Sequence, residues 1–172
     1  MKTRTQLRTV LGAAVLAIAF AAPRTLPAQD MGIKVGTPAP SALVESLDGV
    51  AMDLGTMYGK TPVVLEFWAT WCPLCKKLEP AMQAARAKYA GAVQFVSVGV
   101  PANQSAEKQK AYAEKAGLGG QFVFDKAGAA MKAFAVPHTS YVVIIDKAGK
   151  VVYTGVGAEQ DIDAAVMKAM SR

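Results

Sequence analysis

The chain alternates apolar runs of strand length with segments of helical periodicity. The runs at residues 63–68, 93–100 and 141–145 are almost wholly apolar, which is typical of strands covered on both faces. After the first run, Pro73 is a favourable first-turn residue and Gly91 a favourable helix end. Between them the apolar residues recur every three or four positions, which predicts one buried helical stripe. Its members are Cys75, Leu78, Met82, Ala85 and Tyr89.

The second half of the chain continues this alternation. Ser105 has the chemistry of a helix cap and precedes a polar helix that we expect to reach about Lys115. The remaining pattern predicts a short strand, a short helix, a hairpin turn, a return strand and a closing helix. These lie at 121–125, 127–134, 147–150, 151–154 and 161–170. We therefore expect one α/β domain over residues 36–172, with a mixed sheet covered by helices on both faces.

Residues 1–28 have a different pattern from the rest. Three basic residues (Lys2, Arg4 and Arg8) precede an apolar run at 10–22 and then a segment with Pro and Ala, as in a signal peptide. Thirteen apolar residues would make a helix of about 20 Å, short for a hydrocarbon core of about 30 Å. We predict a signal peptide at 1–28, a short N-terminal tail at 29–35, and export of the rest. An uncleaved N-terminal anchor is the alternative.

Composition narrows the possible functions. With 52% hydrophobic and 19% charged residues, the chain is not of the disordered class. The formal net charge of +6 falls to +2 beyond residue 28, which gives no sign of nucleic-acid binding. Two cysteines are too few for a disulfide-rich scaffold or a four-thiolate zinc site.

The two cysteines lie in the motif Trp71-Cys72-Pro73-Leu74-Cys75, between a predicted strand and a predicted helix. This position places Cys72 at an exposed helix N-terminus, where free N–H groups and the helix dipole favour a thiolate. Cys75 follows one turn later and should face the body of the protein. We expect Cys72 to attack a target disulfide and Cys75 to resolve the mixed disulfide. A disulfide that closes so short a loop would add little stability.

At these residues the chain resembles the thioredoxin superfamily. The segment 66–75 is similar to its active-site segment, and Pro80 matches its helix-kinking proline. The segments 36–40 and 47–49 resemble the N-terminal hairpin of the exported TlpA/ResA-type branch, and the helix and strand at 105–125 resemble the central insertion of that branch. The resemblance covers about 36–157. It implies a thioredoxin-like α/β fold, a mixed β-sheet flanked by helices with both of these additions.

The resemblance also implies a function. It suggests a periplasmic thiol-disulfide oxidoreductase that reduces protein disulfides in cytochrome c or metalloprotein maturation. Its substrates would be protein disulfides or thiols, and a membrane-embedded donor of the DsbD/CcdA type would restore its electrons. The Cys72–Cys75 pair would be the redox centre, with no separate cofactor and no nucleic-acid partner.

Glu66 interrupts an apolar strand and matches the buried acid of thioredoxin. A buried carboxyl has a raised pKa and can exchange a proton with the resolving thiol, so we count it as a third catalytic residue. The alternative is a side chain turned toward solvent or a lysine. Many TlpA/ResA-type proteins instead carry a glutamate three residues after the second cysteine; here Leu78 holds that position and Glu79 follows.

The segment 136–140 departs from the family pattern. The superfamily places a cis-proline before the third strong strand, and a count back from that strand puts Ser140 there. Pro137 would need a three-residue shift to take this role. We expect the Thr139–Ser140 peptide to be trans, because a non-proline cis bond costs about 3 kcal/mol. The expected surroundings of the dithiol are Trp68, Trp71, Pro73, Pro137, His138, Thr139 and Ser140.

The same segment supports an alternative function. It is similar to a loop of Sco-type copper proteins, in which a histidine joins two cysteines, and Cu(I) favours thiolate and imidazole ligands. Cys72, Cys75 and His138 could therefore serve a copper-binding assembly factor. Against this, Sco-type proteins have one more residue between their cysteines and lack Trp68 and Trp71. His138 is otherwise a solvated loop side chain or a group that tunes the thiolate.

Two other sets of residues have plain structural interpretations. Met167 and Met170 have helical spacing, which favours a place in the core over metal binding. The basic residues of the predicted first helix are expected on its solvated face. These are Lys76, Lys77, Arg86 and Lys88.

Overall fold

The computed structural model describes residues 31–172, so the expected signal peptide at 1–28 lies outside the described residues. A seven-stranded sheet has the order β2-β1-β5-β4-β3-β6-β7. The strands are β1 (Leu43–Ser46), β2 (Ala51–Asp53), β3 (Val63–Trp68), β4 (Gln94–Gly99), β5 (Gln121–Phe124), β6 (Tyr141–Ile145) and β7 (Val151–Val156). The helices are the 3-10 helix η1 (Leu54–Met57) and the α-helices α1 (Pro73–Lys88), α2 (Ala106–Ala116), α3 (Ala129–Ala133) and α4 (Ile162–Met170).

The sheet is mixed, as expected. β3 pairs in parallel with β4 and antiparallel with β6, and all six residues of β3 are buried. Its almost uninterrupted apolar run reflects this central position, because both of its faces are covered. The register places Trp68 beside Gly99 and Phe67 beside Tyr141. The end of β3 that leads to the dithiol thus lies beside the start of β6.

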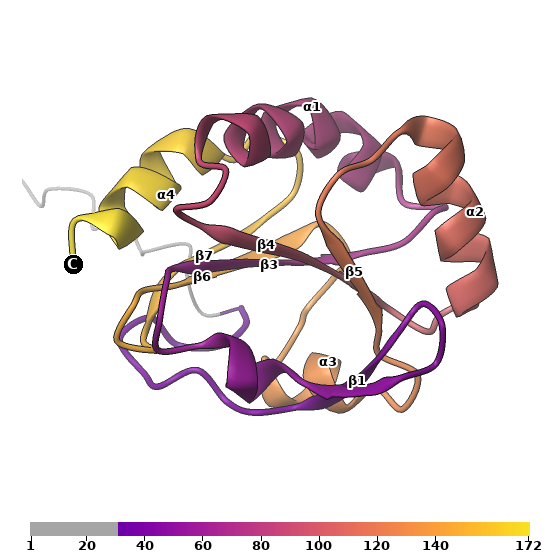
Figure 1. Ribbon diagram of the computed structural model, residues 1–172, viewed down its shortest axis with the longest axis horizontal. Coiled ribbons are helices and arrows are strands. Elements are labelled where there is room, and N and C mark those ends of the chain that lie inside the picture. Colours follow the sequence, from indigo (N-terminus) through magenta and orange to yellow (C-terminus); the bar gives the residue numbers. More distant parts are fainter. Residues whose placement is uncertain (1–30) are drawn as a thin grey trace, which may run out of the picture.

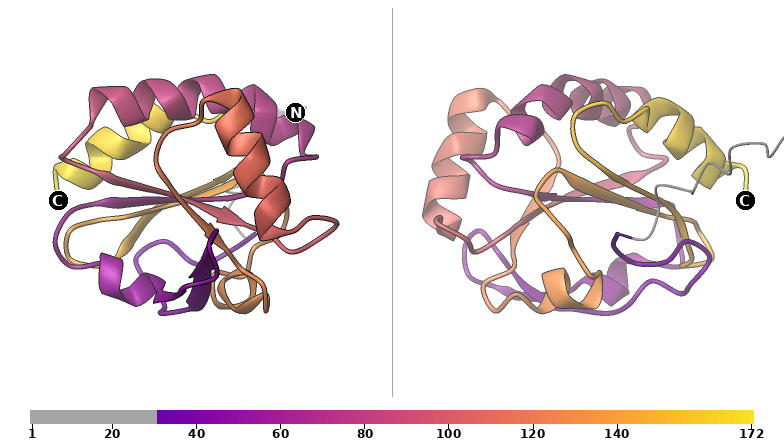
Figure 2. Two further views of the ribbon diagram at one scale, coloured as in Figure 1. Left: turned by 45° about the vertical axis from the view of Figure 1, so that its right-hand side comes forward. Right: turned by 180° about the vertical axis from the view of Figure 1, so that it is seen from behind.

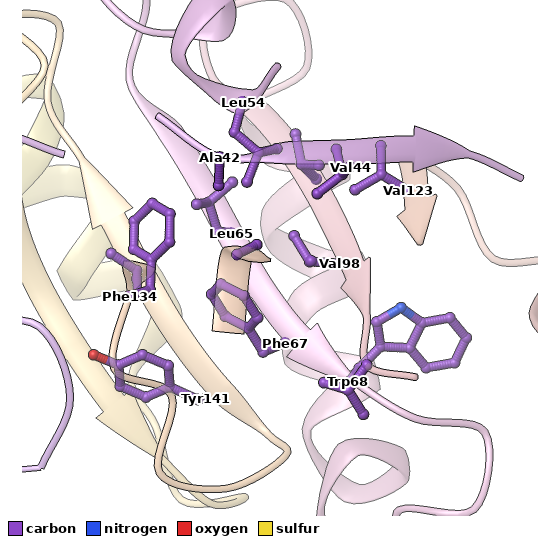
Figure 3. Packing of buried hydrophobic residues seen from close by; sticks show 14 of the residues in the cluster. Ala42, Val44, Leu54, Leu65, Phe67, Trp68, Val98, Val123, Phe134 and Tyr141 are labelled. Carbon is purple, nitrogen blue, oxygen red and sulfur yellow. The ribbon is translucent and has the colours of Figure 1, made fainter. Parts of the chain in front are cut away.

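Helices cover the two faces unequally. α1, α2 and α4 lie on one face, whereas α3 and η1 lie on the other (Figures 1 and 2). The α3 face holds an apolar cluster in which Leu65 and Phe67 of β3 pack with Phe134 and Tyr141 (Figure 3). On the other face, Val64 packs with the buried stripes of α1 and α4. Both faces therefore bury apolar area against β3, which anchors the strand from which the dithiol motif emerges.

α1 begins where its sequence predicts it, but it ends at Lys88 with Tyr89 as the C-cap residue, before the expected end at Gly91. Pro73 occupies the first turn and Cys72 is the N-cap residue. Pro80 lies inside the helix at an exposed position. The basic residues agree with the predicted solvated face except for one: the Arg86 side chain is only 8% exposed. That prediction is wrong for Arg86, because its side chain extends between α1 and the sheet to acidic partners described below.

The two expected additions to the fold are present. β1 and β2 form the N-terminal hairpin, and α2 with β5 forms the central insertion, in which β5 extends the sheet beside β4. Ser105 caps α2, and Gly117 ends it in a left-handed conformation with φ 62°. The backbone N–H of Ile33 donates to the Tyr141 hydroxyl at 3.0 Å. A residue of the expected tail at 29–35 thus contacts the domain.

α4 corrects the interpretation of the methionine pair. Met167 and Met170 are 54% and 42% exposed, so they do not belong to the core. The helix instead buries a stripe of smaller and branched residues against β6 and β7. Within residues 31–172, no helix has the length and apolar character needed to cross a membrane.

Candidate active site

The two cysteines form a disulfide at the N-terminus of α1, with their Cα atoms 5.3 Å apart. The backbone N–H of Cys75 points at the Cys72 sulfur, 3.0 Å away. The N–H of Cys72 donates to the Ala69 carbonyl at 3.1 Å, which closes the turn from β3 into the helix. The first turn of the helix therefore offers an N–H donor and the positive end of its dipole to Cys72, as a thiolate nucleophile requires.

Neither sulfur-bearing residue is exposed in this disulfide form. Cys72 is 1% and Cys75 is 4% exposed, so the predicted exposure of Cys72 is wrong here. Both cysteines belong to the apolar core cluster, and the bond between them holds the Cys72 sulfur there. Trp71 and Leu74 are instead the exposed residues of the motif, at 45% and 43%. They leave an apolar rim around a covered disulfide.

Gln104 fastens the loop before the dithiol, and sequence reasoning missed it. Its Oε1 accepts from the Thr70 N–H at 2.9 Å, and its Nε2 donates to the Val100 carbonyl at 2.6 Å. Beside it, the Trp71 indole N–H donates to the Ala102 carbonyl at 2.7 Å. No sequence pattern distinguishes this glutamine from other loop residues, because its partners are backbone groups of two strand ends that only the fold brings together.

Glu66 is buried, as its place in an apolar strand predicts. Its side chain is 2% exposed, and Oε1 has no hydrogen-bond partner among the described residues. The pKa of this carboxyl is raised to about 8, chiefly by burial and also by the negative charge of Glu79, while the positive charge of Arg86 opposes the shift. The alternative of a side chain turned toward solvent or a lysine is not observed, since the nearby cation is an arginine.

Arg86 connects two acids beneath α1. One guanidinium nitrogen donates to Glu79 Oε1 at 2.8 Å. The other donates to Ser97 Oγ at 2.9 Å and lies 3.6 Å from Glu66 Oε2. Sequence reasoning missed this link, although Glu79 and Arg86 lie seven residues apart on one helix and so share a face.

A small cavity adjoins the second cysteine. Its volume is about 10 Å³, which suits a single water molecule. Glu79 lines it, whereas Glu66 is not among its lining residues. The predicted acid is thus buried nearby, but the acid at the cavity is the residue that follows Leu78. The lining residues are Trp68, Ala69, Cys75, Lys76, Glu79 and Tyr112.

Ser140, which the count back from β6 assigns to the proline position of the family pattern, has a left-handed backbone conformation. The peptide bonds of residues 31–172 are all trans, including those before Pro137 and Ser140. Ser140 is buried with φ 63°, and its N–H donates to the Phe67 carbonyl at 2.9 Å. A proline could neither adopt this φ nor donate that bond. Gln160 Nε2 donates to the Ser140 carbonyl at 3.1 Å, which holds the loop from the other side.

The rest of this loop does not complete a metal site. His138 is exposed, and Pro137 and Thr139 are partly buried. Among the described residues, no three His, Cys, Asp or Glu side chains are grouped so that they could hold a metal ion. Residues 31–172 in the disulfide form therefore do not assemble Cys72, Cys75 and His138 as copper ligands.

Comparisons with known proteins agree with this geometry. The Redoxin family model matches residues 34–170. The thioredoxin-like protein YneN of Bacillus subtilis is 34% identical over 106 residues, which cover 61% of this chain and 62% of that protein. The thiol-disulfide oxidoreductase ResA of Geobacillus kaustophilus is 30% identical over 168 residues, which cover 92% of this chain and 94% of that one.

A solved structure gives the same result. It is described as a putative thiol:disulfide interchange protein DsbE from Chlorobium tepidum, and it matches with a TM-score of 0.71 and 25% identity. The match covers 80% of this chain and 99% of that chain. The chain belongs to the Redoxin family and is a thioredoxin-like thiol-disulfide oxidoreductase of the TlpA/ResA type.

Proposed function

We propose that this protein works as an exported reductant of protein disulfides, in cytochrome c or metalloprotein maturation. One observation carries the assignment as a reductant rather than an oxidant. Both cysteines are buried, and a single N–H group donates to the Cys72 sulfur. Burial disfavours a charged thiolate and so favours the disulfide over the dithiol. A protein whose own disulfide is favoured gives its electrons readily to a target.

The reaction follows from the places of the two thiols. The Cys72 thiolate attacks a target disulfide, a mixed disulfide forms, and the first target sulfur leaves as a thiolate. Cys75 then attacks the Cys72 sulfur, the Cys72–Cys75 bond forms, and the second target sulfur leaves. The dithiol is oxidised and the target disulfide is reduced by two electrons. Glu66 influences proton transfer in the second step, because its pKa of about 8 lies near the pH at which the reaction runs.

The apolar rim formed by Trp71 and Leu74 would contact the protein substrate, since exposed aromatic and aliphatic side chains supply much of an interface's affinity. A membrane-embedded donor of the DsbD/CcdA type would reduce the Cys72–Cys75 disulfide again. Export is supported by the basic and then apolar pattern of residues 1–28. These residues would direct the domain to the periplasm, either cleaved or as an anchor.

The reduction potential tests this direction. The purified domain is equilibrated in thiol–disulfide buffers, and its dithiol fraction is read by alkylation. We expect a potential below the value of about −180 mV typical of disulfide isomerase and closer to the value of about −270 mV of thioredoxin. A value near the −120 mV of a strong oxidant would contradict the reductase assignment.

A pair of variants tests the roles of the two thiols. Cys75→Ser should accumulate mixed disulfides with protein targets, because attack by Cys72 remains and resolution is lost. Cys72→Ser is the matched control and should form none. In the reduced protein at about pH 6, iodoacetamide should label Cys72 before Cys75; the reverse order would mean that the roles are exchanged.

A further inference from the structure

Glu79 lies at the boundary between the cavity beside Cys75 and solvent. The cavity of about 10 Å³ has room for one water molecule. A wider groove between α1 and α2 lies next to it, and Lys76, Glu79 and Tyr112 line both spaces. Of these three, Glu79 alone is a carboxyl group. Its side chain is 22% exposed, so it borders both the cavity beside Cys75 and the solvent.

The side chain of Glu79 is also held in a defined position. Arg86 donates to its Oε1 at 2.8 Å, and Gln83 Nε2 donates to the same oxygen at 2.9 Å. Both bonds use Oε1, which leaves Oε2 to accept a proton. Arg86 is fixed in turn by Ser97 Oγ at 2.9 Å. This arrangement ties one carboxylate oxygen to the protein and leaves the other without a hydrogen bond among the described residues.

We propose that Glu79 carries the proton between Cys75 and solvent through a water molecule in the cavity, and that Arg86 is the positioning residue that links Glu79 to Glu66. This proposal rests on the proposed function, in which Cys75 is the resolving thiol. Geometry distinguishes the two acids, because Glu79 lines the cavity at Cys75 and Glu66 does not.

The resolving step moves one proton from Cys75 to Glu79 and exchanges one disulfide bond for another. In the mixed disulfide, the Cys75 thiol gives its proton to the water, which passes one to Glu79. The resulting thiolate attacks the Cys72 sulfur, the Cys72–Cys75 bond forms, and the bond from Cys72 to the target sulfur breaks. The target sulfur leaves with the electron pair. Glu79 then releases the proton to solvent through the groove.

Glu66 enters this step through the arginine that it shares with Glu79. The groups that face Glu66 are Arg86 and Glu79 from α1 and Ser97 from β4, while Lys76 and Tyr112 face the cavity. As the pH passes about 8, Glu66 becomes charged, and Arg86 then divides its positive charge between two carboxylates. The positive charge of Arg86 then opposes proton transfer to Glu79 less strongly. The rate of resolution by Cys75 should therefore rise through this pH.

The test separates attack from resolution in the full chain. Reduced protein is mixed with excess dithiobis-nitrobenzoate under stopped flow, and the coloured thiol is followed. The first release reports attack by Cys72, and the second reports resolution by Cys75. Glu79→Gln should slow the second release about 10- to 100-fold near neutral pH, with the first within about twofold. The defect should shrink at high pH, where hydroxide removes the Cys75 proton.

Three further variants complete the test. Arg86→Lys keeps the charge but not the forked hydrogen bonds, and it should slow the second release and flatten its rise near pH 8. Glu66→Gln should also remove that rise, with little effect below neutral pH. Glu114→Gln, an exposed acid on α2, is the matched control and should change neither release.

Two results for Glu79→Gln would contradict the proposal. A second release within twofold of wild type in Glu79→Gln would overturn the proposal, as would equal slowing of both releases, which would indicate a disturbed site. Cys75→Ser tests the proposed function independently, since it should show the first release alone. If that variant shows no first release, the assignment of the attacking thiol fails whatever Glu79 does.

Discussion

The two faces of β3 differ in chemistry although they belong to one strand. Leu65 and Phe67 point toward α3, into a cluster that is almost wholly apolar (Figure 3). The intervening residue Glu66 points toward α1, where Arg86 lies 3.6 Å from its carboxylate and donates to Ser97 of β4. Side chains alternate between the faces of a strand, so a single strand can bury apolar area on one side and hold an ionisable group on the other.

This difference shows how a small redox domain can bury an ionisable carboxyl group. The α3 face packs aromatic rings at centroid distances of 5.6 and 6.0 Å around Phe67, and this packing stabilises the strand. The α1 face is then free to hold a carboxyl whose burial is unfavourable. The contrast extends to the loops. Gln104, in the loop that leads to α2, fastens the loop before the dithiol, whereas the loop after α3 contains the strained Ser140.

The largest expected effect on stability comes from creating a cavity in the apolar cluster on the α3 face. Phe67 is fully buried, so Phe67→Ala should lower the free energy of unfolding by about 3–5 kcal/mol through lost burial and a cavity. Urea unfolding measures this loss. Leu43→Ala, at a position 67% exposed, is the control and should change stability by less than about 0.5 kcal/mol. Similar losses in the two variants would contradict the division between the faces.

Glu66→Gln should change how stability depends on pH. The folded carboxyl has a pKa of about 8 against an ordinary value of 4.5, so the folded protein binds the extra proton between these values. The wild type therefore loses stability as the pH rises from about 4.5 to about 8 and becomes level beyond. The variant lacks this slope, and it should gain roughly 1–3 kcal/mol relative to the wild type across the range.

Urea unfolding at several pH values between about 5 and 9 measures the effect. The exposed acid Glu159 provides the matched control, since Glu159→Gln should keep the wild-type slope. Parallel profiles for Glu66→Gln and the wild type would mean that Glu66 is already ionised in the folded protein.

Gln104→Ala should loosen the loop before the dithiol, which contains Thr70. The Thr70 N–H and the Val100 carbonyl lose their side-chain partners, which should cost about 1–2 kcal/mol. Hydrogen exchange at the Thr70 amide should become faster. Gln104→Glu keeps the acceptor for Thr70 and loses only the donor, so it should retain protection at that amide. Equal exchange in both variants would show that the loop is held by other contacts.

The smallest effect tests the strain at Ser140. Its φ of 63° costs a residue with a Cβ about 1–2 kcal/mol, whereas glycine adopts it freely. Ser140→Gly and Ser140→Ala both lose the hydroxyl bond to the Gly157 carbonyl, but only alanine keeps the strain. The glycine variant should be more stable than the alanine variant by about 1 kcal/mol in denaturant unfolding. The opposite order would contradict the strained conformation.

Local features of the sequence predicted most of the fold. The apolar run at Val63–Trp68 and the strand Tyr141–Ile145 are observed with the expected bounds, because strands buried on both faces are apolar along their whole length. Pro73 and Ser105 mark the starts of α1 and α2 through chemistry that acts within a few residues. The place of the dithiol between strand and helix follows from the same local signals.

Contacts between distant segments decided the rest. Arg86 is a charged helix residue, and nothing in its spacing says that Ser97 of β4 and Glu66 of β3 lie beneath it. Gln104 acts on two strand ends that meet only in the folded sheet. Sequence alone determined where the cysteine pair and the main strands lie, since propensity, capping and periodicity are local. The tertiary structure alone decided which ionisable groups are buried and which acid lines the cavity beside Cys75, because desolvation depends on what packs against a side chain.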